Sequence, residues 1–185
     1  MRFASLVLVC AAFAAAAETP RPAPPFSVHR VGAADLTLNS YRGKVLLFVF
    51  ISTTCPHCQD FTRELVPLAK EYAPKGVQVL ECAIDPGADK AVPGFIQQFQ
   101  PPFPVGYSTQ AEVDKFVGRS IIDTRPFYVP HILFLDRQGR IEAEFPGTSD
   151  FLTNPAGNTR AQLDKLLSEK PETAVRKTSA RKSGK

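Results

Sequence analysis

Two nearly continuous apolar runs stand out in the pattern of hydrophobic and polar positions along the chain. They are Lys44–Ser52 (KVLLFVFIS) and Val77–Asp85 (VQVLECAID). Apolar runs of this length, rich in β-branched and aromatic residues, indicate strands that are buried on both faces of a sheet. Between them, a helical segment begins at Pro56 and ends at Gly76. Strand, helix and strand at this spacing predict a parallel, right-handed βαβ unit.

The helical segment is marked by a stripe of apolar residues at helical spacing. The stripe consists of Phe61, Leu65, Leu68, Ala69 and Tyr72. Pro67 lies inside it, and we expect a kink there because proline lacks the amide hydrogen that a helix interior needs.

Shorter elements flank this unit. One or two short strands are predicted within residues 29–44, with a turn at Gly43. After the unit we predict a short helix at 95–99, a short strand within 103–108 and a helix capped by Thr109.

A hairpin and a last helix complete the pattern. His131–Leu135 and Arg140–Phe145 alternate as strands do, and Asp136–Gly139 has the residues of a turn. Asn158 is expected to cap a helix that runs to about Glu169. The chain is therefore predicted to be an α/β protein.

The first 17 residues have the pattern of a secretion signal. Arg2 gives a positive start, an apolar run extends from Phe3 to Phe13, and Ala14–Ala17 offers small residues for cleavage. The apolar run is too short for a membrane anchor. A short core helix and a lipid attached at Cys10 are the alternatives.

These features divide the chain into four parts. We predict a signal peptide (1–17), a Pro-rich extended linker (18–26), one domain (27–169) and a basic disordered tail (170–185). The tail holds six basic residues and one acidic residue, while the whole chain has a formal net charge of +4. The domain itself is therefore near neutral, which argues against nucleic-acid binding. Contact of the tail with an anionic membrane surface is the alternative to a solvated tail.

Cleavage of the signal would remove Cys10 and leave Cys55, Cys58 and Cys82. An odd number of cysteines cannot form a closed disulfide framework. Cys82 lies in a run predicted to be buried, which favours an inert core thiol; a second redox step through Cys82 is the alternative.

Cys55 and Cys58 bracket Pro56 and His57 at the start of the predicted helix. Proline favours the first helical position, which puts Cys55 at the N-cap and Cys58 one turn deeper on the same face, so the sulfurs can bond to each other. The unpaired N–H groups and the helix dipole favour a thiolate at Cys55, and the thiolate is the reactive form. A charged His57 would strengthen this effect and make the disulfide a stronger oxidant. A solvated His57 with no role is the alternative.

A metal site is the main rival explanation of the motif. Zinc usually takes four ligands, often from two close Cys/His pairs. Beyond the motif the chain offers Cys82, His29 and His131, and none of these forms a second close pair. A purely structural disulfide would close too short a loop to constrain the chain.

Two stretches, KVLLFVFISTTCPHC and YVPHILFLDRQGRI, carry a family resemblance. A buried strand that runs into a C-x-x-C at a helix start, with a later Val-Pro before an antiparallel hairpin, resembles the thioredoxin superfamily. The closer similarity is to its exported TlpA/ResA-like branch, over roughly residues 26–169. It implies a thioredoxin-like three-layer fold: a mixed central sheet flanked by helices, with short N-terminal extension strands. The CPHC tetrapeptide is similar to that of DsbA-type oxidases.

The resemblance also implies roles for individual residues. Cys55 would be the attacking cysteine and Cys58 the resolving one. Val129–Pro130 would match the family's cis-proline segment and, with Thr54, would line a substrate groove. The family usually has tryptophan at the position of Thr54, and thioredoxins keep a buried aspartate, their proton acceptor, near the position of Val49.

From these observations we expect an exported protein thiol-disulfide oxidoreductase of the bacterial periplasm or another extracytoplasmic space. It would exchange disulfides with protein thiols through the Cys55–Cys58 disulfide, need no cofactor or metal, and be restored by an upstream redox partner. The Pro-His pair favours oxidation of substrates, whereas the TlpA/ResA-like frame favours their reduction. A copper- or zinc-binding module on the same fold and a thiol peroxidase are the alternatives, although no proline precedes Cys55 as in peroxiredoxins.

Overall fold

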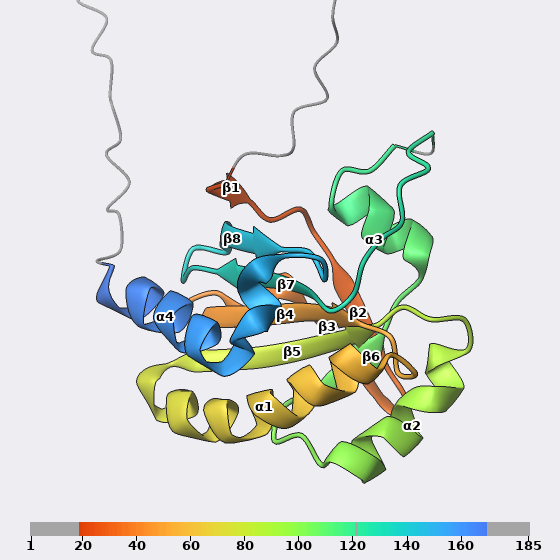
Figure 1. The fold of residues 1–185 in the computed structure, drawn as a ribbon, viewed down its shortest axis with the longest axis horizontal. Helices are drawn as coiled ribbons and strands as arrows, with labels where there is room; N and C mark the ends of the chain where they lie inside the picture. The colour runs from red at the N-terminus through yellow and green to blue at the C-terminus, as the bar shows by residue number, and fades with distance from the viewer. Residues whose placement is uncertain (1–18, 121, 170–185) are drawn as a thin grey trace, which may run out of the picture.

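The computed structural model describes residues 19–120 and 122–169 (Figure 1). The predicted signal peptide (1–17) and basic tail (170–185) lie outside the described residues. An eight-stranded sheet lies at the centre, in the order β1-β8-β7-β4-β5-β6-β2-β3. Its strands are β1 (Arg21–Pro22), β2 (Ser27–Arg30), β3 (Ala33–Thr37), β4 (Val45–Ile51), β5 (Val77–Ala83), β6 (Val105–Tyr107), β7 (His131–Leu135) and β8 (Arg140–Phe145). The helices are α1 (Pro56–Tyr72), α2 (Ala88–Phe99), α3 (Gln110–Phe116) and α4 (Pro155–Ser168), with short 3-10 turns at Leu38–Tyr41, Ala73–Lys75 and Asp150–Thr153.

The central strands confirm the predicted βαβ unit. β4 and β5 pair in parallel from Val45↔Val77 to Ile51↔Ala83, and α1 connects them. On its other edge β4 pairs antiparallel with β7. The sheet is therefore mixed, and the predicted hairpin strands at 131–135 and 140–145 have the bounds that the sequence indicates.

Alternating residues of the central strands divide the core into two layers. One layer, beneath α1, α2 and α4, contains Val49 and Cys58. The other, on the face that α3 covers, contains Phe48, Phe50 and Cys82. Figure 1 shows α1 and α4 side by side on the same side of the sheet. This three-layer α/β arrangement matches the fold class predicted from the sequence.

The structure corrects the prediction of an extended linker before residue 27. Arg21–Pro22 pairs with β8 and forms an edge of the sheet. Phe26 is only 7% exposed, and its ring lies 4.9 Å from that of Phe116 and 5.4 Å from that of Phe50. The described part of this segment is thus attached to the domain, because Phe26 completes one core layer.

Two helices begin earlier than the sequence suggested. α2 begins at Ala88, directly after Gly87, whose φ of 80° a glycine adopts without strain. α4 begins at Pro155, and the side chain of Asn154, not Asn158, accepts a hydrogen bond from the Gly157 amide at 3.2 Å. By contrast, the predicted cap at Thr109 is confirmed.

Among the described residues, no helix has both the length and the apolar character to cross a membrane. Helix α1 continues through Pro67 as a single element.

Candidate active site

Cys55 lies where β4 leaves the sheet and α1 begins. It is the N-cap residue of α1, with extended backbone angles, and Pro56 occupies the first helical position. The Cys55 carbonyl accepts the first helical hydrogen bond, from the Gln59 amide at 3.0 Å. Cys55 is partly exposed, whereas Cys58 is completely buried. The structure therefore offers one thiol to solvent and keeps the other beneath it.

The turn that presents Cys55 is held by Asp85, at the end of β5. The Asp85 carboxylate accepts hydrogen bonds from the Thr53 amide at 2.8 Å and from the Thr53 hydroxyl at 2.6 Å. The Gln59 side-chain amide donates to the Thr53 carbonyl at 2.8 Å. These bonds fix the backbone two residues before Cys55 to both the neighbouring strand and the helix. This role of Asp85 could not be predicted from the sequence, since it depends on how the two parallel strands end side by side.

Cys58 has the environment of a thiol that resists ionisation. Burial raises the pKa of the Cys58 thiol far above its ordinary range, and the nearby Cys55 and Glu81 raise it further. Only the Ser52 amide, which donates to Cys58 Sγ at 3.5 Å, opposes the shift. Ionisation of Cys58 therefore needs a group that can take its proton.

Glu81 is a buried carboxyl group close to this thiol. It lies on β5 opposite Val49 and has no exposed surface. Its side chain is on the face of the sheet that α1 covers, where it meets Thr62. The Thr62 hydroxyl lies 2.9 Å from Glu81 Oε1 and 3.0 Å from the Cys58 carbonyl oxygen, and the second Glu81 oxygen has no partner among the described residues. Burial raises the pKa of Glu81 to about 8, and the Thr62 bond offsets this only in part. Val49 occupies the position on β4 where thioredoxins keep a buried aspartate, and the carboxyl group lies instead on the adjacent strand, β5.

The other predicted site residues surround the pair in different ways. Thr54, Pro56 and His57 are exposed around Cys55. The peptide bond between Val129 and Pro130 is cis. Pro130 directly precedes β7, whose His131 pairs with Phe50 near the end of β4. The Val129–Pro130 segment and the turn that carries Cys55 therefore lie at the same end of the sheet.

Gly147 is a further residue at this end of the sheet that sequence analysis missed. A Cβ atom there would lie 2.6 Å from the Val129 carbonyl oxygen. The Gly147 amide also donates to the Tyr128 carbonyl at 3.3 Å. Only glycine therefore fits the close approach of this loop to the segment before Pro130.

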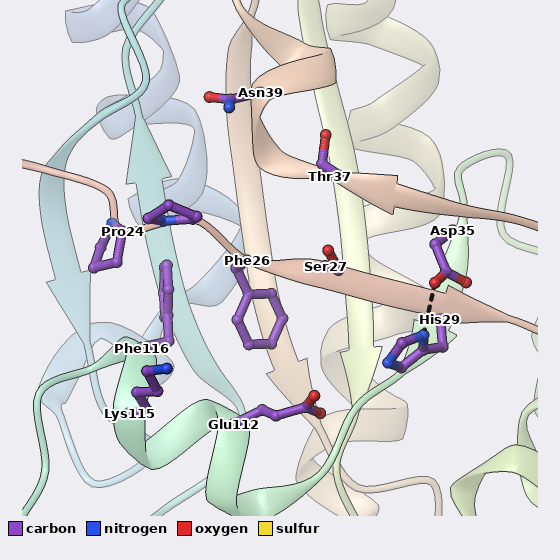
Figure 2. A pocket seen from close by; sticks show the side chains of 11 residues that line it. Pro24, Phe26, Ser27, His29, Asp35, Thr37, Asn39, Glu112, Lys115 and Phe116 are labelled. Carbon is purple, nitrogen blue, oxygen red and sulfur yellow. Dashed lines mark hydrogen bonds and ion pairs between the residues drawn. The ribbon is translucent and has the colours of Figure 1, made fainter.

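Cys82, His29 and His131 lie apart from the pair. Cys82 is fully buried in the opposite core layer, and burial raises its pKa well above the ordinary value. Figure 2 shows His29 directed toward Asp35, with 2.8 Å between Nδ1 and the carboxylate, in a cavity of about 600 Å³. His131 binds Glu144 at 2.7 Å. Within residues 19–120 and 122–169, no three His, Cys, Asp or Glu side chains are grouped as a metal site requires.

Comparison with known proteins shows what the chain is similar to. The family model described as Redoxin matches residues 18–163. The thiol-disulfide oxidoreductase ResA of Bacillus thuringiensis subsp. konkukian is 26% identical over 150 residues, which cover 81% of this chain and 77% of ResA.

Solved structures show the same fold. A thioredoxin-family thiol:disulfide interchange protein from Chlorobium tepidum matches with a TM-score of 0.66 and 22% identity, covering 81% of this chain and 98% of its own. A thiol:disulfide interchange protein from a Bacteroides species matches with a TM-score of 0.64 and 18% identity, covering 84% and 93%. The fold is therefore thioredoxin-like.

The buried Glu81 predicts a specific dependence of stability on pH. In the folded protein Glu81 has a pKa of about 8, whereas in the unfolded chain its pKa is the ordinary 4.5. Between these two pH values the folded protein keeps the proton that the unfolded chain has lost. The free energy of unfolding should therefore fall as the pH rises through this window, by up to about 1.4 kcal/mol per pH unit, and then level off. Glu81→Gln removes the titrating proton and should remove this fall. Urea unfolding at several pH values measures it.

Glu64→Gln is the matched control, because Glu64 is an exposed carboxylate on α1. It should keep the wild-type slope. Equal slopes in wild type and Glu81→Gln would show that Glu81 is already ionised in the folded protein.

Proposed function

The chain belongs to the Redoxin family and is a thiol-disulfide oxidoreductase, and we propose that it exchanges disulfides with protein substrates through Cys55 and Cys58. The observation that carries the proposal is the difference between the two thiols. Cys55 is partly exposed at the N-terminus of α1, and Cys58 is fully buried one helical turn deeper. Of these two thiols, only Cys55 can meet the disulfide of another protein.

The reaction is two successive exchanges. The Cys55 thiolate attacks one sulfur of a substrate disulfide, the substrate S–S bond breaks, and one substrate thiolate leaves. Cys58 then attacks the Cys55 sulfur, releases the second substrate thiolate and forms the Cys55–Cys58 disulfide. Two electrons pass from the pair to the substrate, and the reverse sequence oxidises a substrate dithiol. The reduced Cys55/Cys58 dithiol itself supplies the two electrons, so no cofactor is required, and a redox partner restores the pair.

Glu81 is proposed as the proton acceptor for Cys58. Cys58 must lose its proton to attack, and burial opposes this ionisation. A carboxyl group whose pKa is about 8 is a well-matched base for a thiol. Glu81 would thus take the role that thioredoxins give to a buried aspartate on the neighbouring strand.

The remaining site residues are proposed to bind substrate and to tune the pair. Thr54 is exposed directly before Cys55, and Val129 is partly buried beside Pro130 at the same end of the sheet. Together these three residues would line the groove for the substrate chain. Pro56 and His57, both exposed, would set the redox potential of the disulfide.

We place the reaction outside the cytoplasm, in the periplasm of a bacterium or a comparable compartment. The support is the pattern of a positive start, an apolar run and small residues in the first 17 positions. An oxidising compartment is also where disulfide exchange with proteins is needed.

Replacing the resolving cysteine should trap the intermediate. With Cys58→Ser and insulin as a disulfide substrate, a covalent adduct at Cys55 should accumulate, because nothing attacks the mixed disulfide. Cys55→Ser should form no adduct, and Cys82→Ser should retain full turnover. Non-reducing electrophoresis and peptide mass mapping identify the adduct.

Two outcomes would contradict the proposal. One is an adduct that forms equally well in Cys55→Ser. The other is stoichiometric zinc or copper in protein purified without chelator, lost in Cys58→Ala, which would indicate the metal-binding alternative.

The role of Glu81 predicts a pH profile for resolution of the mixed disulfide. In the wild-type protein the rate should rise with pH around the Glu81 pKa of about 8 and level off above it, where Glu81 is fully ionised. In Glu81→Gln it should be about 100-fold lower at pH 8 and should keep rising, because solvent must take the proton. Stopped-flow measurement separates this step from the first attack by Cys55, which should be unchanged. Equal slowing of both steps would instead indicate a general disturbance of packing.

A further inference from the structure

Residues 52–55 form the tight turn that carries the chain from β4 into α1. The Cys55 amide closes this turn by donating to the Ser52 carbonyl at 3.2 Å. Cys55 is the N-cap of α1, and its φ of −77° and ψ of 119° lie outside the helical region. The helix alone therefore does not orient Cys55, and the direction of its side chain depends on the turn before it.

Cys58, by contrast, is held by α1 and by the core. It lies within the helix and has no exposed surface. The Thr62 hydroxyl donates to the Cys58 carbonyl at 3.0 Å, and the Ser52 amide donates to Cys58 Sγ at 3.5 Å. The approach of the two sulfurs is therefore decided by the turn that carries Cys55, because Cys58 is already fixed.

The carboxylate of Asp85 holds the centre of this turn. Its two oxygens accept hydrogen bonds from Thr53, one from the amide at 2.8 Å and one from the hydroxyl at 2.6 Å. The Thr53 amide and the Ser52 carbonyl belong to the same peptide unit, so a hydrogen-bonded path runs from Asp85 through this unit to the Cys55 amide. Thr53 is only 8% exposed, so water competes little for these bonds.

Gln59 of α1 holds Thr53 from the other side, because its side-chain amide donates to the Thr53 carbonyl at 2.8 Å. The amide, hydroxyl and carbonyl of Thr53 are thus all bonded, two of them to Asp85 beyond β5 and one to α1. Thr53 cannot rotate about its backbone without breaking one of these bonds. The turn is therefore in place before a substrate arrives.

We propose that Asp85 is a positioning residue for the redox pair and that it acts through Thr53 to hold Cys55 in line with Cys58. The inference rests on the proposed function of the two cysteines. In the mixed disulfide, Cys58 attacks the Cys55 sulfur, the Cys55–Cys58 bond forms, and the substrate thiolate leaves with the electron pair of the bond that breaks. Attack within one molecule is fast only while the reacting atoms are held in the right geometry. The first exchange needs only an accessible Cys55 thiolate, so it depends much less on Asp85.

Reaction of the reduced protein with dithiobis(nitrobenzoate), followed by stopped-flow absorbance, tests the proposal. Each exchange releases one coloured thiolate: the first release reports attack by Cys55, and the second reports attack by Cys58 on the mixed disulfide. Asp85→Ala and Thr53→Val should each slow the second release about tenfold and change the first less than about threefold. Thr53→Val keeps the carboxylate of Asp85, so it separates geometry from charge. Thr53→Ser keeps the hydroxyl and should restore the wild-type rate.

The equilibrium of the pair provides a second measurement. The stability of a disulfide within one protein reflects the effective concentration at which its two thiols are held. In a glutathione redox buffer, Asp85→Ala and Thr53→Val should therefore lower the equilibrium constant for forming the Cys55–Cys58 disulfide about tenfold. This change raises the reduction potential by about 30 mV.

Asp89→Ala is the matched control, because Asp89 is an exposed carboxylate in the first turn of α2. It should leave both releases and the potential unchanged, and circular dichroism verifies that each variant is folded. Four results would overturn the positioning role: a wild-type second release in Asp85→Ala, equal slowing of both releases, equal rates in Thr53→Val and Thr53→Ser, or equal loss in Asp89→Ala. A wild-type protein without any second release would overturn the proposed function itself, and this inference with it.

Discussion

Strand β4 is hydrogen-bonded to β5 along one edge and to β7 along the other, and all seven of its residues are buried. A fully buried Leu, Ile or Phe side chain contributes about 1.5–3 kcal/mol, so a shift of this strand would be very costly. The position of its last residue, Ile51, is therefore fixed. Hydrogen bonds from Thr53 to Asp85, just beyond β5, then hold the backbone between Ile51 and Cys55. Cys55 is presented at the edge of the sheet because the strand before it cannot move.

The sheet also separates groups that are neighbours in the sequence. Glu81 and Cys82 are adjacent on β5, yet they belong to opposite faces, because successive side chains of a strand alternate. Glu81 therefore meets α1 and the buried Cys58, while Cys82 packs in the layer that α3 covers. The same alternation puts His131 on the α3 face, where its ring packs against Phe50 and Phe127. One face of the sheet holds Cys58 and Glu81, and the other holds Cys82 and His131.

Much of this arrangement could be predicted from the sequence, because its causes are local. The long apolar runs predicted β4 and β5, Pro56 predicted the start of α1, and Thr109 with Glu112 forms the capping box expected of a helix start. The errors arose where distant contacts decide. Phe26 lies in a proline-rich stretch that resembles a linker, and only the aromatic cluster around Phe50 and Phe116 shows why it is ordered. Glu81 lies inside a run predicted to be a buried strand, and its interaction with Cys58 depends on how α1 packs on the sheet.

The proposed function requires that Cys55 and Cys58 form the redox pair and that Cys82 takes no part. Mild oxidation of the folded protein, followed by blocking of free thiols, digestion and peptide mass mapping, tests it directly. We predict one disulfide, between Cys55 and Cys58, with Cys82 recovered as a free thiol that is blocked only after unfolding. Recovery of Cys82 in a disulfide with either of the other two, while the folded protein is intact, would contradict the separation of the two faces and the claim with it.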